Sequence, residues 1–500
     1  MTNETQIKRN PRVAIIGAGM TGILMAIKLQ EAGIRQVTIF EKKDKIGGTW
    51  RENTYPGVAC DVPAHMYTYS FEPNPEWSNR FAYGHEIFDY FQRVSDKYGI
   101  TNTINYNEEV TESVYDNGCW HLQTSKGQML TVDFVFNCTG ILHKPAFPDI
   151  KGINSFKGDM FHTAQWDHSV ELKGKRIGII GTGSTATQVI PRLINTEGTE
   201  VSVFQRTPQW IIPFPQKDYS DKDKQRVRNN PMLAPLLHKF YSKGFRELFS
   251  KLVTGSKAQQ AMISRLAKWN LKRSIKDKTL RQKLTPEYQV GCKRLIINND
   301  FYPAIQKDNA HLVTESIDQI TAKGIQTKDG KLHELDILVL STGFDPFAFM
   351  RPMNLIGRDG LDINQVWQNK AVSYKSILLP GFPNFFLMLG PNTPIGNNSV
   401  ISMSETQADY AMQLIEDWRH QQFDAVEPTE EAVKAFMAYI KKGMPNTVWV
   451  TGCNSWYLDA DGDAASWPYS WEQWITDMKT PDYADLQQHR VKPEPAISAA

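Results

Sequence analysis

The chain has 500 residues, of which 41% are hydrophobic and 22% are charged, as is usual for globular proteins. Its 56 Lys and Arg against 54 Asp and Glu leave a net charge of +2, which excludes a global basic field for nucleic acid and the acidic excess of disordered chains. One hydrophobic core supports about 250 to 300 residues, so two or three domains are predicted. Apolar runs stay below the roughly 20 residues that span a bilayer, and no secretory signal pattern is recognised, so we expect a cytoplasmic protein.

The first informative segment starts with an apolar run at 13–16, which is typical of a buried parallel strand. Gly17, Gly19 and Gly22 follow in G-x-G-x-x-G spacing at the start of a predicted helix. Glycines there allow a tight turn and bring a pyrophosphate close to the helix N-terminus. Glu41 ends the next predicted strand, where a carboxylate can accept hydrogen bonds from both hydroxyls of an unphosphorylated ribose. This segment therefore predicts a dinucleotide site, and we assign it to FAD.

A second unit of the same kind begins with the predicted strand at 175–180. Its phosphate loop provides the candidate NADP-binding residues Thr182, Gly183, Ser184, Thr185 and Ala186. The next predicted strand ends in Arg206 and Thr207, where the first unit has an acid. A guanidinium fork suits a 2'-phosphate, so NADP(H) is predicted, although a solvated loop cation is the alternative interpretation of Arg206.

Two further apolar strands, at 132–138 and 335–341, run into Thr-Gly turns on either side of the second unit. The chain is therefore predicted to leave the first domain near Gly140 and to return near Thr342. We predict an α/β fold with two Rossmann-like domains, in which the NADP domain is inserted in the FAD domain. The expected division is 1–140 for the first part of the FAD domain, 141–174 for a linker, 175–341 for the NADP domain, and 342–500 for the second part of the FAD domain with a Trp-rich C-terminal segment.

The NADP domain is predicted to contain a helical excursion at about 217–290. This segment has 18 Lys and Arg against 6 Asp and Glu, a local charge of +12, which leaves −10 for the rest of the chain. Three interpretations of this segment remain open: a helical excursion packed on its own domain, a lid, or a basic amphipathic surface for lipid head groups.

Five cysteines are scattered along the chain without a C-x-x-C pair, and we interpret all of them as reduced thiols. They are Cys60, Cys119, Cys138, Cys292 and Cys453. Among proteins with two dinucleotide sites, the missing pair counts against disulfide reductases and favours monooxygenases. No metal site is expected.

One segment just before the second glycine loop matches a family fingerprint. The residues that carry it are Phe156, Gly158, His162 and Trp166, in F-x-G-x-x-x-H-x-x-x-W spacing. A second stretch, earlier in the chain, contains Thr49, Trp50 and Asp61. It is similar to the family segment G-G-x-W-x-x-x-x-Y-P-G-x-x-x-D. Over nearly its whole length the chain thus resembles the type I Baeyer-Villiger monooxygenases. The resemblance places the fingerprint in the linker, with His162 as a hydrogen-bonding hinge and Trp166 as an anchor.

This resemblance implies an enzyme in which NADPH reduces FAD, and a flavin C4a-peroxide formed with O2 converts a ketone to an ester or lactone. Arg294 lies where the family has its active-site arginine, and Asp61 would orient it. Lys293 would reach the 2'-phosphate beside Arg206 and Thr207. The resemblance also suggests a set of residues beside FAD: Thr49, Trp50, Asp61, Tyr67, Val110 and Asn392.

Two alternatives remain open at this stage. A related monooxygenase that oxidises amines or sulfides would have less need for Arg294, because an uncharged heteroatom attacks a protonated hydroperoxide. A non-catalytic flavoprotein that serves as a redox sensor belongs to a different class. The intact phosphate loops, Arg206 and Arg294 count against this second alternative. The identity of the ketone and the oligomeric state are not indicated by the sequence.

Overall fold

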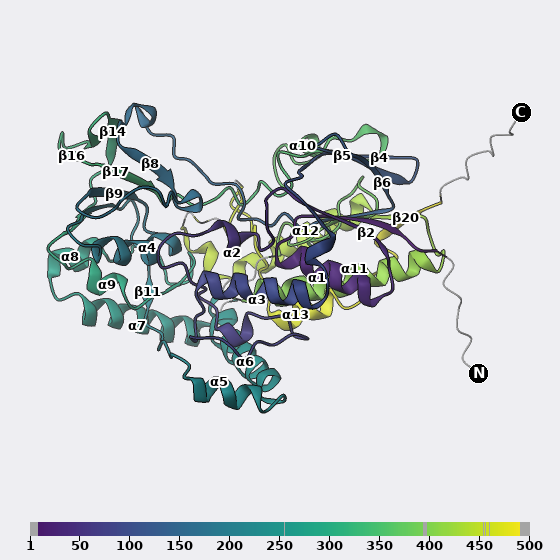
Figure 1. Cartoon of the computed structure of the whole chain (residues 1–500), viewed down its shortest axis with the longest axis horizontal. Coiled ribbons are helices and arrows are strands. Elements are labelled where there is room, and N and C mark those ends of the chain that lie inside the picture. The colour runs from purple at the N-terminus through teal and green to yellow at the C-terminus, as the bar shows by residue number, and fades with distance from the viewer. Residues whose placement is uncertain are drawn as a thin grey trace, which may run out of the picture.

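The computed structural model describes residues 9–254, 256–393, 398–453, 455, 457–459 and 461–490. Two lobes, each built around a parallel five-stranded sheet, dominate the view in Figure 1. The first sheet has the strand order β19 (Phe385–Leu387), β7 (Phe134–Asn137), β1 (Arg12–Ile16), β2 (Gln36–Glu41) and β3 (Ile104–Tyr106). All its neighbouring strands are parallel. Strands from both ends of the chain thus form one sheet.

The second sheet lies entirely within the intervening part of the chain. Its order is β13 (Ala310–Val313), β10 (Glu200–Phe204), β9 (Arg176–Ile180), β17 (Ile337–Leu340) and β8 (Asp159–His162), again with parallel neighbours. The fingerprint segment therefore contributes the edge strand β8 to this sheet. The domain boundaries given above stay predictions.

The first lobe adds helices and smaller sheets around the first sheet. Helix α1 (Met20–Glu31) packs beside α11 (Val400–Arg419). The other helices are α2 (Thr49–Glu52), α3 (Gly84–Lys97), α10 (Ile363–Val366), α12 (Glu430–Gly443) and α13 (Trp471–Asp477). A four-stranded sheet comprises β18 (Asn354–Ile356), β4 (Val110–Asp116), β5 (Cys119–Thr124) and β6 (Met129–Val132), and β20 (Ala425–Pro428) pairs with β21 (Leu486–His489).

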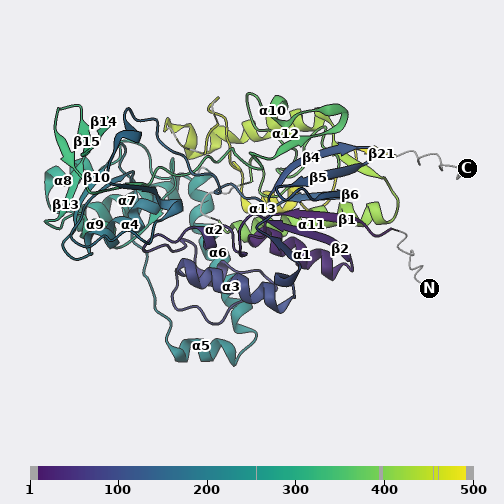
Figure 2. The ribbon, with the colours of Figure 1, turned by 45° about the horizontal axis from the view of Figure 1, so that its top comes forward.

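The second lobe carries the predicted helical segment. Its helices are α4 (Ser184–Ile194), α5 (Asp221–Arg228), α6 (Leu233–Val253), α7 (Lys257–Ser274), α8 (Lys278–Lys283) and α9 (Phe301–Ala304). The remaining strands are β11 (Ile211–Ile212), β12 (Ile296–Ile297), β14 (Ile317–Thr321), β15 (Gly324–Thr327) and β16 (Leu332–Glu334). Figure 2 shows α5 standing apart from both lobes at the lower end of the molecule. Within the described residues, no helix is long and apolar enough to cross a membrane.

Short 3-10 turns connect these elements. They are η1 (Ala64–Met66), η2 (Thr101–Thr103), η3 (Ile153–Ser155), η4 (Thr163–Gln165), η5 (Arg358–Gly360), η6 (Met444–Asn446) and η7 (Val448–Thr451).

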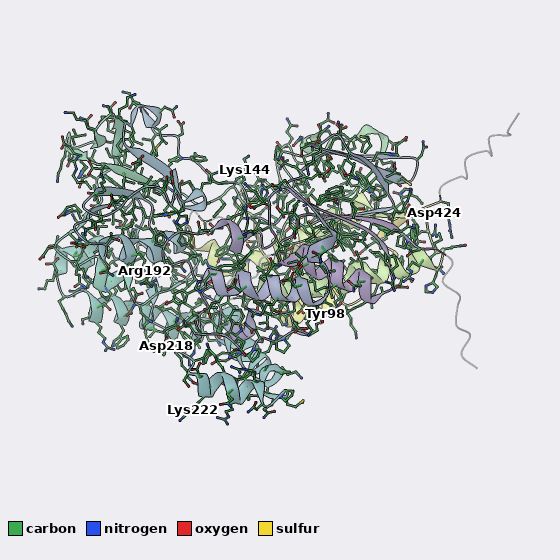
Figure 3. All side chains as sticks on the ribbon, viewed as in Figure 1. Tyr98, Lys144, Arg192, Asp218, Lys222 and Asp424 are labelled. Carbon is green, nitrogen blue, oxygen red and sulfur yellow. A yellow bond between two sulfur atoms is a disulfide. The ribbon has the colours of Figure 1, made fainter. Side chains whose placement is uncertain are left out.

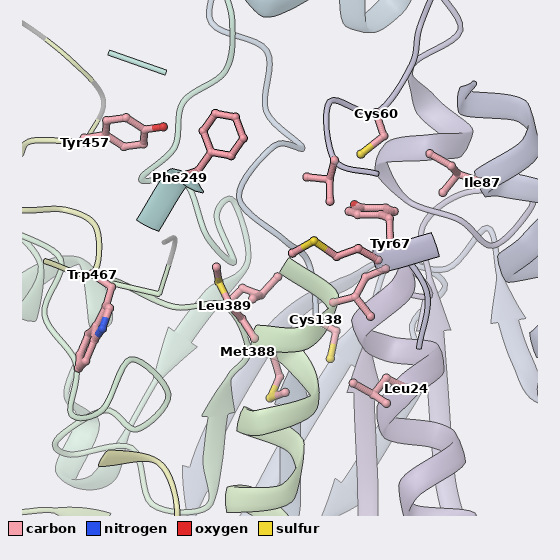
Figure 4. Close-up of a cluster of buried hydrophobic side chains, with 14 of the residues drawn as sticks. Leu24, Cys60, Tyr67, Ile87, Cys138, Phe249, Met388, Leu389, Tyr457 and Trp467 are labelled. Carbon is pink, nitrogen blue, oxygen red and sulfur yellow. The ribbon is translucent and has the colours of Figure 1, made fainter. Parts of the chain in front are cut away.

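The first lobe is held together by apolar side chains on both faces of its sheet. All four residues of β7 are buried, because helices and the smaller sheet cover both of its faces. The Phe136 ring stacks on Phe386 of β19 with centroids 4.8 Å apart. Burial of one such ring contributes roughly 1.5–3 kcal/mol to folding. Figure 4 shows how this interior continues through Leu24 and Cys138 toward Tyr67.

The prediction of five reduced thiols is wrong for two of them. Cys292 and Cys453 form a disulfide, while Cys60, Cys119 and Cys138 are free. The pair is separated by 161 positions, yet the fold brings its Cα atoms to 6.1 Å. Local spacing therefore contained no signal for this bond. Trp456 and residues 491–500 of the predicted Trp-rich segment lie outside the described residues.

Candidate active site

Both glycine loops lead into helices whose first N–H groups have no side-chain cap. Gly19 is the N-cap of α1 and Gly183 is the N-cap of α4, and neither helix has a capping side chain. Unsatisfied N–H groups together with the helix dipole favour a bound phosphate. Gly17 has φ of +100°, and a Cβ atom there would lie 2.8 Å from the Cys138 carbonyl oxygen. The first loop thus requires glycine at this position.

Glu41 is fixed at the tip of β2 by two backbone hydrogen bonds. Its Oε2 accepts from the Ala18 N–H and its Oε1 from the Lys43 N–H, both at 2.9 Å. Burial raises the pKa of Glu41, and these two hydrogen bonds act in the opposite direction. A carboxylate offers about four lone-pair sites, so acceptor capacity remains for two ribose hydroxyls. This arrangement fits the ribose of FAD.

The other residues predicted to lie beside FAD occupy the first lobe. Thr49 is the first residue of α2, and Val110 is the buried first residue of β4. Trp50 donates from Nε1 to the Tyr67 hydroxyl at 3.2 Å, and the two rings meet edge to face. Asn392 donates from Nδ2 to the Ala464 carbonyl oxygen at 2.6 Å.

Asn392 also leaves a polar atom for a ligand. Its Oδ1 is buried and has no hydrogen-bond partner among the described residues. A buried acceptor of this kind costs free energy unless a donor satisfies it. Together with the uncapped helix α1 and the fixed Glu41, this acceptor fits the polar groups of FAD.

The second loop ends beside two cations. The Thr182 hydroxyl donates to the Thr207 carbonyl oxygen at 2.8 Å, which ties the phosphate loop to the turn after β10. Arg206 in this turn is exposed. The pKa of Lys293 is lowered by burial and further by the positive charge of Arg206, so the two cations lie near each other. Such a pair favours a doubly charged anion, and it fits the 2'-phosphate of NADP(H).

The other predicted residues of this loop begin helix α4. Ser184 and Thr185 are the first two residues of the helix, and Ala186 is fully buried.

Asp61 and Arg294 meet between the two lobes. Arg294 donates from Nε to Oδ2 at 3.0 Å and from Nη2 to Oδ1 at 2.6 Å, a bidentate pair. Burial alone would lower the pKa of Arg294, but the charge and hydrogen bonds of Asp61 outweigh it and raise this pKa above its usual value. Arginine has five N–H donors and Asp61 takes two, so the guanidinium can hold the carboxylate and still donate to a further anion. The structure therefore brings the two predicted catalytic residues together.

Sequence reasoning missed Gln188, which connects the lobes. From α4, its Oε1 accepts from the Tyr55 hydroxyl at 3.0 Å, and its Nε2 donates to the Ala59 carbonyl oxygen at 3.0 Å. Both partners lie in the stretch that leads to Asp61. A lone glutamine in a predicted helix carries no pattern that would have revealed this role.

The fingerprint residues surround the edge strand β8. The His162 ring is buried, its Nδ1 accepts from the Ala164 N–H at 3.0 Å, and burial lowers its pKa. Trp166 packs edge to face on Phe161 with centroids 4.9 Å apart. Phe156 lies against Gly158, where any side chain would also strike the Asp336 carbonyl oxygen. His162 is therefore a neutral, buried ring, and its role as a hinge stays a prediction.

A cleft of about 1100 Å³ opens between the lobes, beside the stretch that leads to Asp61. It is lined by residues of both lobes, among them Trp50, Val58, Arg192 and Phe344. Figure 3 labels Arg192 on the second lobe and Lys144 on the connection between the lobes. Asp61 and Arg294 do not line this cleft.

Comparison with known proteins decides the family. The flavin-binding monooxygenase-like family model matches residues 10–426. The chain belongs to the flavin-binding monooxygenase-like family. The resemblance seen in the sequence is thereby confirmed.

Similar proteins cover almost the whole of this flavin-binding monooxygenase-like chain. An uncharacterised monooxygenase of Mycobacterium tuberculosis is 46% identical over 92% of this chain and 93% of its own length. A Baeyer-Villiger monooxygenase of Pseudomonas aeruginosa is 37% identical over 93% of this chain and 89% of its own length. The crystal structure of OTEMO in complex with FAD and NADP superposes with a TM-score of 0.85 at 26% identity, covering 96% of this chain and 100% of that one. The predicted α/β fold with two dinucleotide-binding units is confirmed.

Proposed function

We propose that this chain is a Baeyer-Villiger monooxygenase that uses FAD, NADPH and O2 to convert a ketone to an ester or lactone. The family match and the similarity to a Baeyer-Villiger monooxygenase at 37% identity support the activity, and the similarity to a structure with FAD and NADP supports both cofactors. When bound and reduced, FAD supplies the reaction with O2. The substrates are a small-molecule ketone and O2, and the proposal includes a cytoplasmic location.

The bidentate pair of Asp61 and Arg294 is the observation that carries the reaction type. An arginine keeps its charge in a poorly solvated site, and its unused N–H groups can stabilise a negative oxygen. Asp61 fixes the plane of the guanidinium, so these donors have one direction. Arg206, Thr207 and Lys293 bind the 2'-phosphate and select NADPH in this proposal.

The proposed function is tested by product identification. The FAD-loaded protein should be incubated with NADPH, air and a panel of cyclic, linear and aromatic ketones, and the products analysed by mass spectrometry. We expect a gain of one oxygen atom as an ester or lactone from at least one ketone. Conversion of thioethers or amines in the absence of any ester would instead establish the heteroatom-oxygenating alternative.

The redox-sensor alternative has a distinct outcome in the same assay. A non-catalytic flavoprotein would oxidise NADPH slowly and release hydrogen peroxide without oxygenating any compound. Reaction with neither ketones nor heteroatoms, but stoichiometric hydrogen peroxide, would overturn the proposed function.

A weak contact with an anionic membrane surface is the second part of the proposal. Three large apolar side chains are exposed at the start of helix α6. They are Met232, just before the helix, and Leu236 and Phe240 within it, with exposed fractions of 67%, 57% and 71%. Their four-residue spacing places them on one face. Lys239 and Lys243 are exposed on the same helix, in the segment whose charge is +12. Apolar side chains bordered by cations are typical of helices that lie in a membrane interface.

Vesicle sedimentation tests this contact. We expect the protein to bind vesicles that contain phosphatidylserine and to bind vesicles of phosphatidylcholine more weakly. A double variant with Leu236→Ser and Phe240→Ser should lose this binding. Exposed Met129 on β6, in the other lobe, provides a matched control as Met129→Ser. Equal sedimentation of the variant, or self-association through this face without lipid, would contradict a membrane contact.

A further inference from the structure

The stretch that leads to Asp61 pairs with another segment of the first lobe along one of its two edges. Residues 58–60 form two backbone hydrogen bonds of 2.9 Å with residues 82–84, and both bonds come from the residues on either side of Ala59. Ala59 itself is in an antiparallel bridge with Tyr83. In such a pairing the N–H and C=O of the middle residue point away from the partner segment, so Ala59 presents both groups at the opposite edge.

The side chain of Gln188 occupies this opposite edge. Its Oε1 accepts from the Ala59 N–H at 3.3 Å, and its Nε2 donates to the Ala59 carbonyl oxygen at 3.0 Å. The Tyr55 hydroxyl also donates to Oε1, at 3.0 Å. A glutamine amide offers both an acceptor and a donor, so it can take the place of a neighbouring strand for one residue. A single side chain of the second lobe thus completes the pairing of a backbone segment in the first.

Gln188 lies one helical turn beyond the phosphate loop that we assign to NADP(H). Helix α4 begins at Ser184, and residue 188 is on the same face of the helix four positions later. The two lobes approach closely here, because a Cβ atom at Gly57 would lie 2.9 Å from the Gln188 carbonyl oxygen. The phosphate loop and the Asp61 stretch are therefore connected through a single turn of helix and one side chain.

We propose that Gln188 is a positioning residue, which aligns Asp61 and thereby orients the guanidinium of Arg294 toward the negative oxygen that it stabilises. The inference rests on the proposed function, because it assigns the active cation to Arg294. Asp61 follows Ala59 by two positions and forms both hydrogen bonds to Arg294. A shift of Ala59 therefore moves the carboxylate that fixes the plane of the guanidinium, and a misplacement of about 1 Å can lower a rate about 100-fold.

Three variants separate the hydrogen bonds of this side chain. Gln188→Met has a similar length and removes all three bonds. Gln188→Glu keeps the acceptor for the Ala59 N–H but, when ionised, has no donor for the Ala59 carbonyl oxygen. Tyr55→Phe removes one bond and leaves both bonds to Ala59. Gln306 provides the matched control, because its Nε2 donates to two backbone carbonyl oxygens that both belong to the second lobe.

The first experiment measures kcat for ketone oxygenation, product formed per NADPH oxidised, hydrogen peroxide release and the KM for NADPH in the FAD-loaded proteins. We expect kcat and product yield to fall about tenfold in Gln188→Met and Gln188→Glu and about twofold in Tyr55→Phe, with the NADPH KM within about twofold. Gln306→Met should behave as wild type. A raised NADPH KM with unchanged kcat would show that Gln188 serves nucleotide binding alone, and would overturn the inference.

The second experiment does not depend on activity. Hydrogen–deuterium exchange reports local opening, and peptides that contain residues 55–63 and 290–297 should exchange faster in Gln188→Met than in wild type, while those of β9 stay unchanged. A purely local role would change 55–63 alone, so unchanged exchange at 290–297 would overturn the inference. Faster exchange of both peptides, in a protein whose wild type oxygenates no ketone, would support the positioning of Asp61 and reject the proposed function instead. Gln188→Glu provides the same comparison should Gln188→Met fail to fold.

Discussion

The guanidinium of Arg294 and the carboxylate of Asp61 form two hydrogen bonds, of 3.0 and 2.6 Å, across 233 positions of sequence. Asp61 belongs to the first lobe and Arg294 follows the helical segment of the second. Correct packing of the lobes is therefore a condition for assembling this pair. An error of 1 Å in that packing would separate the charged groups enough to weaken both hydrogen bonds.

Replacement of Arg294 by Lys tests the need for a planar, bidentate cation. Lysine keeps the charge but cannot form two parallel hydrogen bonds with Asp61, so we expect kcat for ketone oxygenation to fall about 100-fold or more. The KM for NADPH should change little. Arg192→Lys, at an arginine that lines the neighbouring cleft, is the matched control and should retain activity. A fully active Arg294→Lys enzyme would remove the proposed role of the guanidinium fork.

Arg206→Ala tests the assignment of the 2'-phosphate. A charge-assisted hydrogen bond contributes roughly 1.5–3 kcal/mol, so the KM for NADPH should rise about ten- to a hundredfold. NADH has no 2'-phosphate, and its KM should stay nearly constant. Steady-state kinetics with both nucleotides measures the difference, and Arg226→Ala on α5 serves as a control cation. Equal effects on NADPH and NADH would refute the assignment.

Retention of FAD should depend on pH through Glu41. Its carboxylate form accepts the ribose hydrogen bonds, and burial raises its pKa, so protonation begins at a higher pH than for an exposed glutamate. FAD is therefore expected to stay bound at neutral pH and to dissociate as the pH falls through the raised pKa. Flavin fluorescence after ultrafiltration at a series of pH values measures the release. Glu41→Gln should bind FAD more weakly at neutral pH and lose this dependence; an identical pH profile in the variant would show that another group is responsible.

Gly57→Ala probes the contact between the Asp61 stretch and helix α4. Gly57 has φ of +87°, and a Cβ atom there would lie 2.9 Å from the Gln188 carbonyl oxygen. Gly127 has a similar φ of +81° with nothing within 4 Å, so Gly127→Ala isolates the backbone cost of about 1–2 kcal/mol. The clash should add roughly 1–3 kcal/mol to the loss in unfolding free energy of Gly57→Ala. Thermal or urea unfolding gives both values, and equal losses would mean that the lobes do not meet closely here.

The glycine loops and the tips of β2 and β10 could be predicted because their signals are local. Arg12 to Glu41 form one continuous strand, helix and strand, and a similar unit recurs before Arg206. The pairing of Asp61 with Arg294 could be predicted from the family resemblance. No property of either residue within its own segment indicates this pairing.

The rest of the site arises from contacts between distant segments. The Cys292–Cys453 disulfide and the link from Gln188 to the Asp61 stretch each join parts of the chain that local patterns treat separately. The segment at 159–162 lies within the predicted linker, which was assigned from the fingerprint and its place before the second glycine loop, and in the structure it pairs with β17. Hydrogen bonding to a strand more than 170 positions away decided its structure.

The place of β19 in the first sheet has a consequence for biosynthesis. Strand β7 needs β19 as its neighbour, but the ribosome produces Phe385 only 248 residues after Asn137. At about 5–20 residues per second, β7 would wait roughly 12 to 50 s with one apolar edge unpaired. The inserted lobe, whose sheet is complete once β17 has emerged, can fold during this interval. A nascent first lobe with an open edge is a substrate for chaperones, and truncations between residues 340 and 385 should yield aggregated protein.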